Sequence, residues 1–121
     1  MPTPFSCQFT FTPDNKAVVI ALSGKLDPEA VQELHPQVQE VFQQGGLRRF
    51  VFDLNDLQYI GSLGVRLLLA LRQQVKGEGQ VALCRTTPAV QSILNIMKLQ
   101  DVLPTYASRE EALEATSERG A

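Results

Sequence analysis

Three short apolar segments, each followed by a longer segment with helical periodicity, constrain the fold of this chain more than any other feature. The apolar segments are residues 16–23 (KAVVIALS), 49–54 (RFVFDL) and 80–84 (QVALC). Each has the length and apolar content of a buried strand, and turn or glycine residues lie close to its ends. Strands that alternate with helices predict right-handed crossovers and therefore a mixed, mostly parallel sheet.

The two ends of the chain add further strands. Residues 5–11 (FSCQFTF) alternate apolar and polar side chains, which predicts a strand with one buried and one wet face. The turn residues at 13–15 (PDN) make this strand the antiparallel hairpin partner of the strand that follows. Residues 102–106 are expected to form a short edge strand, because Pro104 lacks the backbone donor that a central strand needs.

The expected helices begin at recognisable residues. Asp27 and Thr87 each precede a proline and are N-cap signals, and Ser108 with Glu111 forms a capping box. A further helix is expected over residues 62–76, with its first serine as a possible cap. The predicted element order is therefore β-β-α-β-α-β-α-β-α. The residues expected to face the core from the first and third helices are Val31, Leu34, Val38, Val90, Ile93, Leu94 and Met97.

Composition excludes several classes of function. The 121 residues suffice for one domain, with a core over about residues 5–116 and a frayed tail at 117–121. The net charge of −2 does not favour nucleic acid or anionic membrane as a partner. No apolar run reaches the roughly 20 residues that cross a bilayer. One histidine and two distant cysteines predict no metal site and two buried, reduced thiols. We therefore expect a soluble, cytoplasmic protein.

The segment DLQYIGSLGV (residues 56–65) places Ser62 between two glycines, where an apolar strand gives way to a helix. A serine nucleophile of the G-x-S-x-G type needs glycine at position 60, which is isoleucine, and a base. The only histidine, His35, lies within the first expected helix. The segment also lacks the lysine and the glycine spacing that a phosphate-binding loop requires. Ser62 is left as a helix cap, as a target of phosphorylation, or as both.

Four separated blocks occur in order along the chain: residues 22–27 (LSGKLD), 51–54 (VFDL), 57–64 (LQYIGSLG) and 87–90 (TPAV). Together they resemble a STAS domain, and more narrowly the bacterial anti-sigma factor antagonists. The resemblance spans about residues 5–113. It implies an α/β domain with a mixed sheet of four to five strands and helices packed mainly on one side.

The resemblance also implies a partner-switching regulator with no catalytic activity and no cofactor of its own. Ser62 occupies the place of the phosphoacceptor serine, Gly64 that of the glycine that follows, and Gly61 stands where the family pattern has aspartate. The unphosphorylated protein would bind an anti-sigma factor that is also a serine kinase and supplies the ATP site. Phosphorylation would release this partner, and a serine phosphatase would reset the switch. The residues expected to form the partner surface are Gly24, Asp27, Gly61, Leu63, Gly64 and Arg66.

A second interpretation stays open. A STAS domain can also serve as a non-switching structural subunit of a signalling or lipid-transport complex. Gly61 in place of aspartate favours this interpretation, whereas Ser62 and Gly64 favour the switch. The expected oligomeric state is a monomer or a weak dimer.

Overall fold

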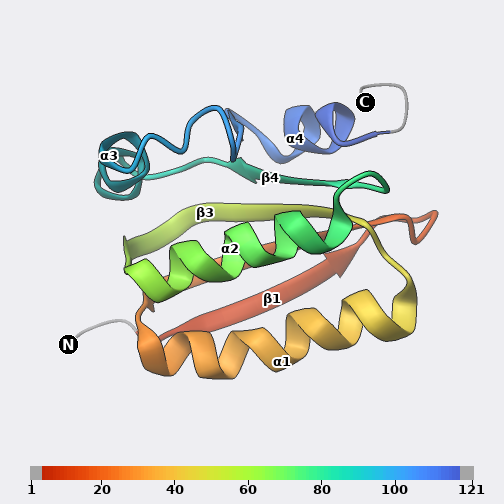
Figure 1. The fold of residues 1–121 in the computed structure, drawn as a ribbon, viewed down its shortest axis with the longest axis horizontal. Helices are drawn as coiled ribbons and strands as arrows, with labels where there is room; N and C mark the ends of the chain where they lie inside the picture. The colour runs from red at the N-terminus through yellow and green to blue at the C-terminus, as the bar shows by residue number, and fades with distance from the viewer. Residues whose placement is uncertain (1–3, 118–121) are drawn as a thin grey trace.

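The computed structural model describes residues 4–117, which form a sheet with helices on both faces (Figure 1). In chain order the elements are β1 (Ser6–Phe11), β2 (Ala17–Leu26), α1 (Pro28–Gly45), β3 (Arg49–Ile60), α2 (Ser62–Val75), β4 (Gln80–Cys84), α3 (Pro88–Ile96), β5 (Thr105–Tyr106) and α4 (Arg109–Ala115). The spatial order of the strands is β1-β2-β3-β4-β5. β1 pairs antiparallel with β2, and all other neighbours are parallel. The predicted α/β class, element order and mixed sheet are confirmed.

The largest difference from the prediction lies in the lengths of the two central strands. β2 reaches Leu26 instead of Ser23, and β3 reaches Ile60 instead of Leu54. Each strand supplies the other with backbone partners beyond its predicted end, and the pairing continues from Ser23 with Asp56 to Leu26 with Ile60. Two register shifts let this paired extension bend. The segment before Ser62 is therefore strand rather than loop.

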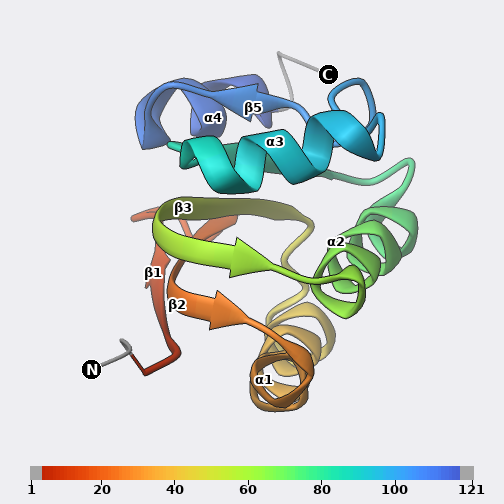
Figure 2. The same ribbon diagram turned by 90° about the vertical axis from the view of Figure 1, so that its left-hand side faces the viewer.

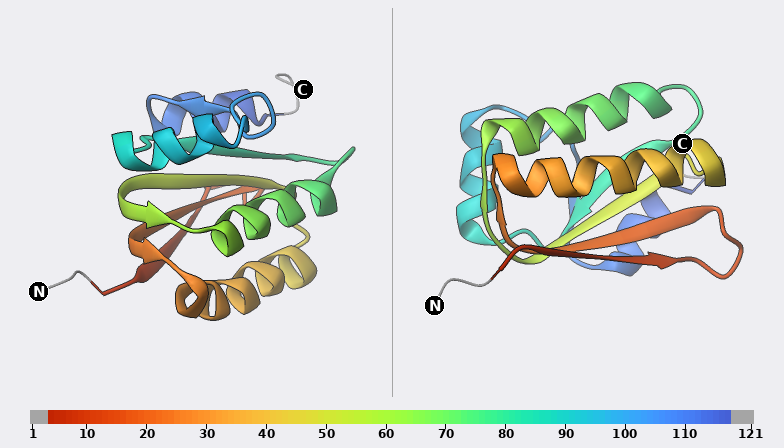
Figure 3. Two further views of the ribbon diagram at one scale, coloured as in Figure 1. Left: turned by 60° about the vertical axis from the view of Figure 1, so that its left-hand side comes forward. Right: turned by 90° about the horizontal axis from the view of Figure 1, so that it is seen from below.

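The two faces of the sheet are covered unequally. The main core is formed by the sheet together with α1, α2 and α3, and it contains large buried side chains such as Phe50 and Phe52. The opposite face carries a small cluster under α4, built from Val51, Cys84 and Ala112 with their neighbours. Figure 2 shows α1 and α2 on one side of β2 and β3, with α4 and β5 on another, and Figure 3 shows α1 and α2 side by side. Helices thus pack mainly on one face, as expected.

The expected core residues of the third helix are only partly confirmed. Val90 and Leu94 are buried, and Ile93 is half-buried against them. The prediction for Met97 is wrong, because its side chain is 44% exposed. Met97 is the C-cap of α3, and the chain turns at Lys98, which has a left-handed φ of 58°. The helix therefore ends at Ile96, and Met97 does not continue the buried face of α3.

The predicted N-caps are confirmed at three helices. The side-chain oxygens of Asp27, Thr87 and Ser108 each accept a hydrogen bond from the backbone N–H three residues later, at 2.9, 3.4 and 3.1 Å. Each bond satisfies one of the amides that a helix leaves unpaired at its start. These local signals fix where α1, α3 and α4 begin.

Three predictions from composition also bear on the structure. Within residues 4–117 no helix has the length and apolar character to cross a membrane. Cys7 and Cys84 are both free thiols; Cys84 is buried, whereas Cys7 is only half-buried on β1. The frayed tail that the sequence predicts falls, apart from residue 117, outside the described residues.

The turn between α2 and β4 packs closely against the residue that precedes β3. The backbone N–H of Gln80 donates to the carbonyl oxygen of Arg48 at 3.0 Å, and a Cβ atom on Gly79 would lie 1.8 Å from that same oxygen. Gly77 differs, because its φ of +86° needs glycine but no atom lies within 4 Å of a Cβ there. Gly79 is thus required by a close approach and Gly77 by its backbone conformation.

We expect Gly79→Ala to lower the free energy of unfolding by about 3 kcal/mol, because the backbone of β3 must move to admit the methyl group. Gly77→Ala is the matched control and should cost only about 1 kcal/mol, from the left-handed conformation alone. Urea unfolding of both variants measures the difference. Equal losses of unfolding free energy in the two variants would contradict the close approach of Gly79 to the Arg48 carbonyl oxygen.

Candidate functional site

The candidate site lies at the carboxyl ends of β2 and β3, where α1 and α2 begin (Figure 2). The backbone N–H of Gly61 donates to the carbonyl oxygen of Leu26 at 3.1 Å, so the two strand ends are joined up to their last residues. The carboxyl ends of neighbouring parallel strands are a common position for binding sites in α/β folds. Here they bring the first turns of two helices together.

Ser62 is exposed and is the first residue of α2. The N-cap is Gly61, whose extended backbone (φ −96°, ψ 178°) continues the direction of β3, and no side chain caps this helix. The interpretation of Ser62 as the N-cap is therefore wrong, because the helix begins one residue earlier than a Ser62 cap requires: Gly61 is the last extended residue and Ser62 is already helical. The amides of the first turn carry the positive end of the helix dipole and lack a side-chain acceptor among the described residues.

Gly64 allows α2 to pack closely on the strand ends. A Cβ atom on Gly64 would lie 2.8 Å from Cδ2 of Leu26 and 3.0 Å from Cγ1 of Ile60, and both of these side chains are buried. An alanine would gain about 1 kcal/mol in helix propensity, but it would push the start of α2 away from the sheet. Gly64 therefore determines how closely the start of α2, and with it Ser62, lies to the ends of the strands.

Gly24 and Asp27 fix the backbone on the other side of the corner. Gly24 has a left-handed φ of +89°, and a Cβ there would lie 3.0 Å from Cα of Phe5 and from the carbonyl oxygen of Pro4. The Oδ1 atom of Asp27 accepts the backbone N–H of Ala30 at 2.9 Å. The carboxylate of Asp27 is thus engaged as the cap of α1.

Two large apolar side chains are exposed near Ser62. Leu63 is 40% exposed and Tyr59 is 46% exposed, although both are large hydrophobic residues. The Tyr59 side chain lies beside Gly61, since a Cβ on that glycine would be 3.1 Å from the phenolic oxygen. Arg66, one turn further along α2, is also exposed. Exposed apolar side chains beside a hydroxyl and a cation suit a protein partner.

The residues predicted from the sequence meet at one corner but do not all lie on its surface. Gly24 and Gly64 are buried, so they shape the surface without lining it. Asp27 is half-buried. Sequence reasoning missed Tyr59, whose signal was an aromatic residue at the end of a strand and two positions before Gly61.

The residues around Ser62 do not form the arrangement of a serine nucleophile. His35 is exposed on α1, and among the described residues no hydrogen bond joins it to Ser62. Within the part of the chain that the structure describes, no group of three or more His, Cys, Asp or Glu residues could hold a metal ion. The chemistry that the corner offers is that of an exposed hydroxyl at a helix start.

A buried ion cluster lies on the α4 face of the sheet. The carboxylate of Asp53, on β3, is only 1% exposed and accepts bonds from Arg85 (Nε 3.1 Å, Nη2 2.6 Å), from Arg109 Nε (2.6 Å) and from the backbone N–H of Asn55 (3.1 Å). Burial by itself raises the pKa of Asp53, but the hydrogen bonds from both arginines and Asn55 outweigh burial and hold this pKa below its usual value. The cluster joins β3, the end of β4 and the start of α4.

Sequence reasoning also missed this cluster. Its one signal was Asp53 inside the apolar segment VFDL, because a carboxylate in a buried strand requires a cation or several hydrogen bonds. Its partners Arg85 and Arg109 lie 32 and 56 residues further along the chain. Nothing local in the sequence connects them to Asp53.

The sequence is similar to a known domain family and to several bacterial proteins. The family model described as "STAS domain" matches residues 8–112. A STAS-domain containing protein of Pseudomonas aeruginosa is 30% identical over 90 residues, which cover 74% of this chain and 87% of that protein. The anti-sigma F factor antagonist of Paenibacillus polymyxa is 27% identical over 97 residues, which cover 79% of this chain and 83% of that protein.

Solved structures agree with the family match. The unphosphorylated form of the anti-sigma factor antagonist SpoIIAA is 25% identical and superposes with a TM-score of 0.80, covering 96% of this chain and 98% of that one. The phosphorylated form of Bacillus SpoIIAA has the same fold, with a TM-score of 0.70 over 90% of this chain and 97% of that one, at 24% identity.

We expect Asp53→Asn to lower the free energy of unfolding at pH 7 by about 2–3 kcal/mol, because two arginines lose their shared carboxylate. The loss should stay below that of a fully buried pair, since the two guanidinium side chains remain 41% and 36% exposed. Asp56→Asn, an exposed carboxylate on the same strand, is the control and should change stability little.

The same cluster predicts a pH dependence. Because the pKa of Asp53 is lower in the folded state, its stabilisation is present above the ordinary carboxyl pKa of about 4 and is lost as the pH falls through the folded value. Urea unfolding from pH 7 to pH 3 should therefore show the wild type and Asp53→Asn converging in acid. A constant difference between them across this range would contradict the assignment.

Proposed function

The chain belongs to the STAS domain family, and from this premise we propose that it is an anti-sigma factor antagonist that phosphorylation of Ser62 switches off. The observation that carries the proposal is the exposure of Ser62 at the start of α2, with the exposed side chains of Leu63 and Tyr59 on the same corner. Relatives named as anti-sigma factor antagonists support the class of partner.

A phosphate on Ser62 is compatible with the fold. Phosphoserine adds roughly −1.5 to −2 charges at neutral pH. At a helix start the dipole and the free amides favour negative charge, typically by about 0.3–1 kcal/mol. Because the N-cap is Gly61, the phosphate oxygens can accept these amide hydrogen bonds without displacing another side chain. The modified domain should therefore stay folded.

The same phosphate is incompatible with a partner docked over the corner. A protein that covers Leu63 and Tyr59 must also bury Ser62, and burying an imperfectly paired charge costs several kcal/mol. Each increment of about 1.4 kcal/mol changes an affinity tenfold. The effect on the complex is thus much larger than the effect on folding, and one modification separates the two proteins without unfolding either.

The proposed cycle takes place in the bacterial cytoplasm. The unphosphorylated protein binds an anti-sigma factor that is itself a serine kinase, and so frees a sigma factor. The kinase supplies ATP and the catalytic groups, while a serine phosphatase returns the antagonist to its binding form. SpoIIAA, which has been solved in unphosphorylated and phosphorylated forms, supports such a two-state cycle. The antagonist itself acts as a monomer or weak dimer.

One residue favours a second candidate function. Gly61 stands where the family pattern has an aspartate, so the helix of this chain starts without a carboxylate next to Ser62. A kinase that recognises that carboxylate would not act here. The domain would then serve as a non-switching structural subunit of a signalling or lipid-transport complex, with the apolar corner as a permanent contact.

We expect Ser62→Asp to weaken binding of the anti-sigma factor about 100-fold while leaving the melting temperature unchanged or slightly raised. The partner is first identified by co-purification with Ser62→Ala, and affinities are then measured by titration calorimetry. Ser92→Asp, on the exposed side of α3, introduces the same charge away from the corner and should leave the affinity unchanged.

The intact mass of the protein from its native cells gives an independent measurement. We expect a phosphate-sized addition on the wild type that is absent from Ser62→Ala. Full binding by Ser62→Asp, together with no such addition under any growth condition, would establish the structural subunit instead of the switch.

A further inference from the structure

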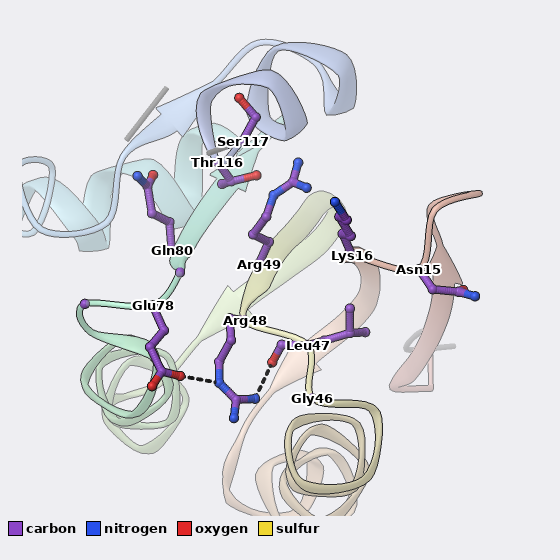
Figure 4. Close-up of a pocket in the computed structure, with 12 residues that line it drawn as sticks. Asn15, Lys16, Gly46, Leu47, Arg48, Arg49, Glu78, Gln80, Thr116 and Ser117 are labelled. Atoms are coloured by element: carbon purple, nitrogen blue, oxygen red, sulfur yellow. Dashed lines mark hydrogen bonds and ion pairs between the residues drawn. The ribbon is translucent and has the colours of Figure 1, made fainter. Parts of the chain in front are cut away.

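A cavity of about 620 Å³ lies at the amino ends of β3 and β4 (Figure 4). Ser62 follows the opposite, carboxyl end of β3. Its walls come from the β1–β2 turn, the α1–β3 connection, the α2–β4 turn and the end of α4. Cavities of about 300–1,000 Å³ are typical of small-molecule sites in proteins. The proposed partner switch makes no use of the amino ends of these strands.

The cavity has an excess of positive charge. Three cations, Lys16, Arg48 and Arg49, line it with one carboxylate, that of Glu78. Arg48 Nε pairs with Glu78 Oε2 at 2.7 Å, so these two charges offset one another (Figure 4). Within residues 4–117 neither Lys16 nor Arg49 forms a direct ion pair, although the carboxylate of Asp14 lies within electrostatic range of both. Two positive charges are therefore left facing the cavity.

The guanidinium group of Arg49 is anchored at the wall of the cavity. Its Nη2 donates to the carbonyl oxygen of Leu113 at 3.1 Å, which fastens the guanidinium group against α4. Its Nε is buried and has no acceptor among the described residues. Buried donors almost always have a partner in native proteins. Figure 4 shows the Arg49 guanidinium and the Lys16 side chain extending toward the same part of the cavity, close to Thr116 and Ser117.

The register of the sheet holds the two cations together. Ala17, which follows Lys16, is the pairing partner of Arg49 across β2 and β3, and Gln80 is the partner of Arg49 across β3 and β4. The close approach of Gly79 to the Arg48 carbonyl keeps the start of β3 in place. Arg49 thus starts from rigid strand backbone, which reduces the entropy that a ligand must overcome, whereas Lys16 starts from the exposed β1–β2 turn.

We propose that this cavity binds a small oxyanion, the phosphate group of a free or esterified phosphate, between Lys16 and Arg49. The planar fork of an arginine and the compact charge of a lysine are the donors that proteins use for phosphate oxygens. The remaining volume of the cavity leaves room for the organic part of a phosphate ester.

An NMR titration tests the proposal with inorganic phosphate and, separately, with glycerol 3-phosphate, both at constant ionic strength. The backbone amide signals of Arg49, Gly79 and Gln80 should shift saturably, and Lys16→Gln should weaken the apparent affinity about tenfold or more. Tighter binding of the ester assigns the site to a phosphorylated small molecule, and equal binding assigns it to phosphate alone.

Two further variants separate a built site from general attraction. Lys98→Gln removes an exposed lysine at the end of α3 and should bind phosphate like the wild type. Arg49→Lys keeps the charge but loses the fork, and should bind more weakly. The proposal is overturned if chloride at matched ionic strength produces the same shifts, or if Lys16→Gln binds as well as Lys98→Gln. Because Lys16 lies in an exposed turn, this comparison stands even where Arg49→Lys fails to fold.

Discussion

The parallel pairing of β2 with β3 through to their last residues is the constraint on which the rest of the structure depends. The two strands end in register at Leu26 and Ile60, and the hydrogen bond from Gly61 to Leu26 carries the pairing one residue further. Each strand is followed almost at once by a helix, so α1 and α2 must begin side by side. Gly64 then decides how closely α2 approaches, and Ser62 is left at the surface of the corner.

The sequence predicts what local interactions decide. Apolar segments and N-cap residues such as Thr87 give nearly all strands and helix starts, because their signals lie within a few residues. The extension of β3 is different: Asp56 is exposed and polar, and it is extended because it pairs with Ser23 of a distant strand. The N-cap of α2 also differs from the prediction, because it is Gly61 and not Ser62. The partners of Asp53 are set entirely by tertiary structure, as is the exposure of Tyr59.

The two ends of the parallel strands have opposite character. At the carboxyl ends Leu63 and Tyr59 are exposed beside the hydroxyl of Ser62, whereas the amino ends carry Lys16, Arg48 and Arg49 around a cavity. A net charge of −2 conceals this separation, because it sums over the whole chain. Local concentration of charge, rather than the total, determines which ligands a surface attracts. A protein partner and a small anion can therefore use the same domain without competing for one surface.

The attachment of α4 has a consequence for how the molecule opens. This helix spans only Arg109–Ala115 and contributes one fully buried apolar side chain, Ala112. Leu113 packs on the same cluster but is only partly buried. The helix is also held by Arg109, which binds the carboxylate of Asp53, and by Arg49, which donates to the carbonyl of Leu113. Segments with few apolar contacts exchange their amide hydrogens first, and charged contacts weaken as salt increases. Local opening of α4 is thus expected to depend on ionic strength while the main core remains closed.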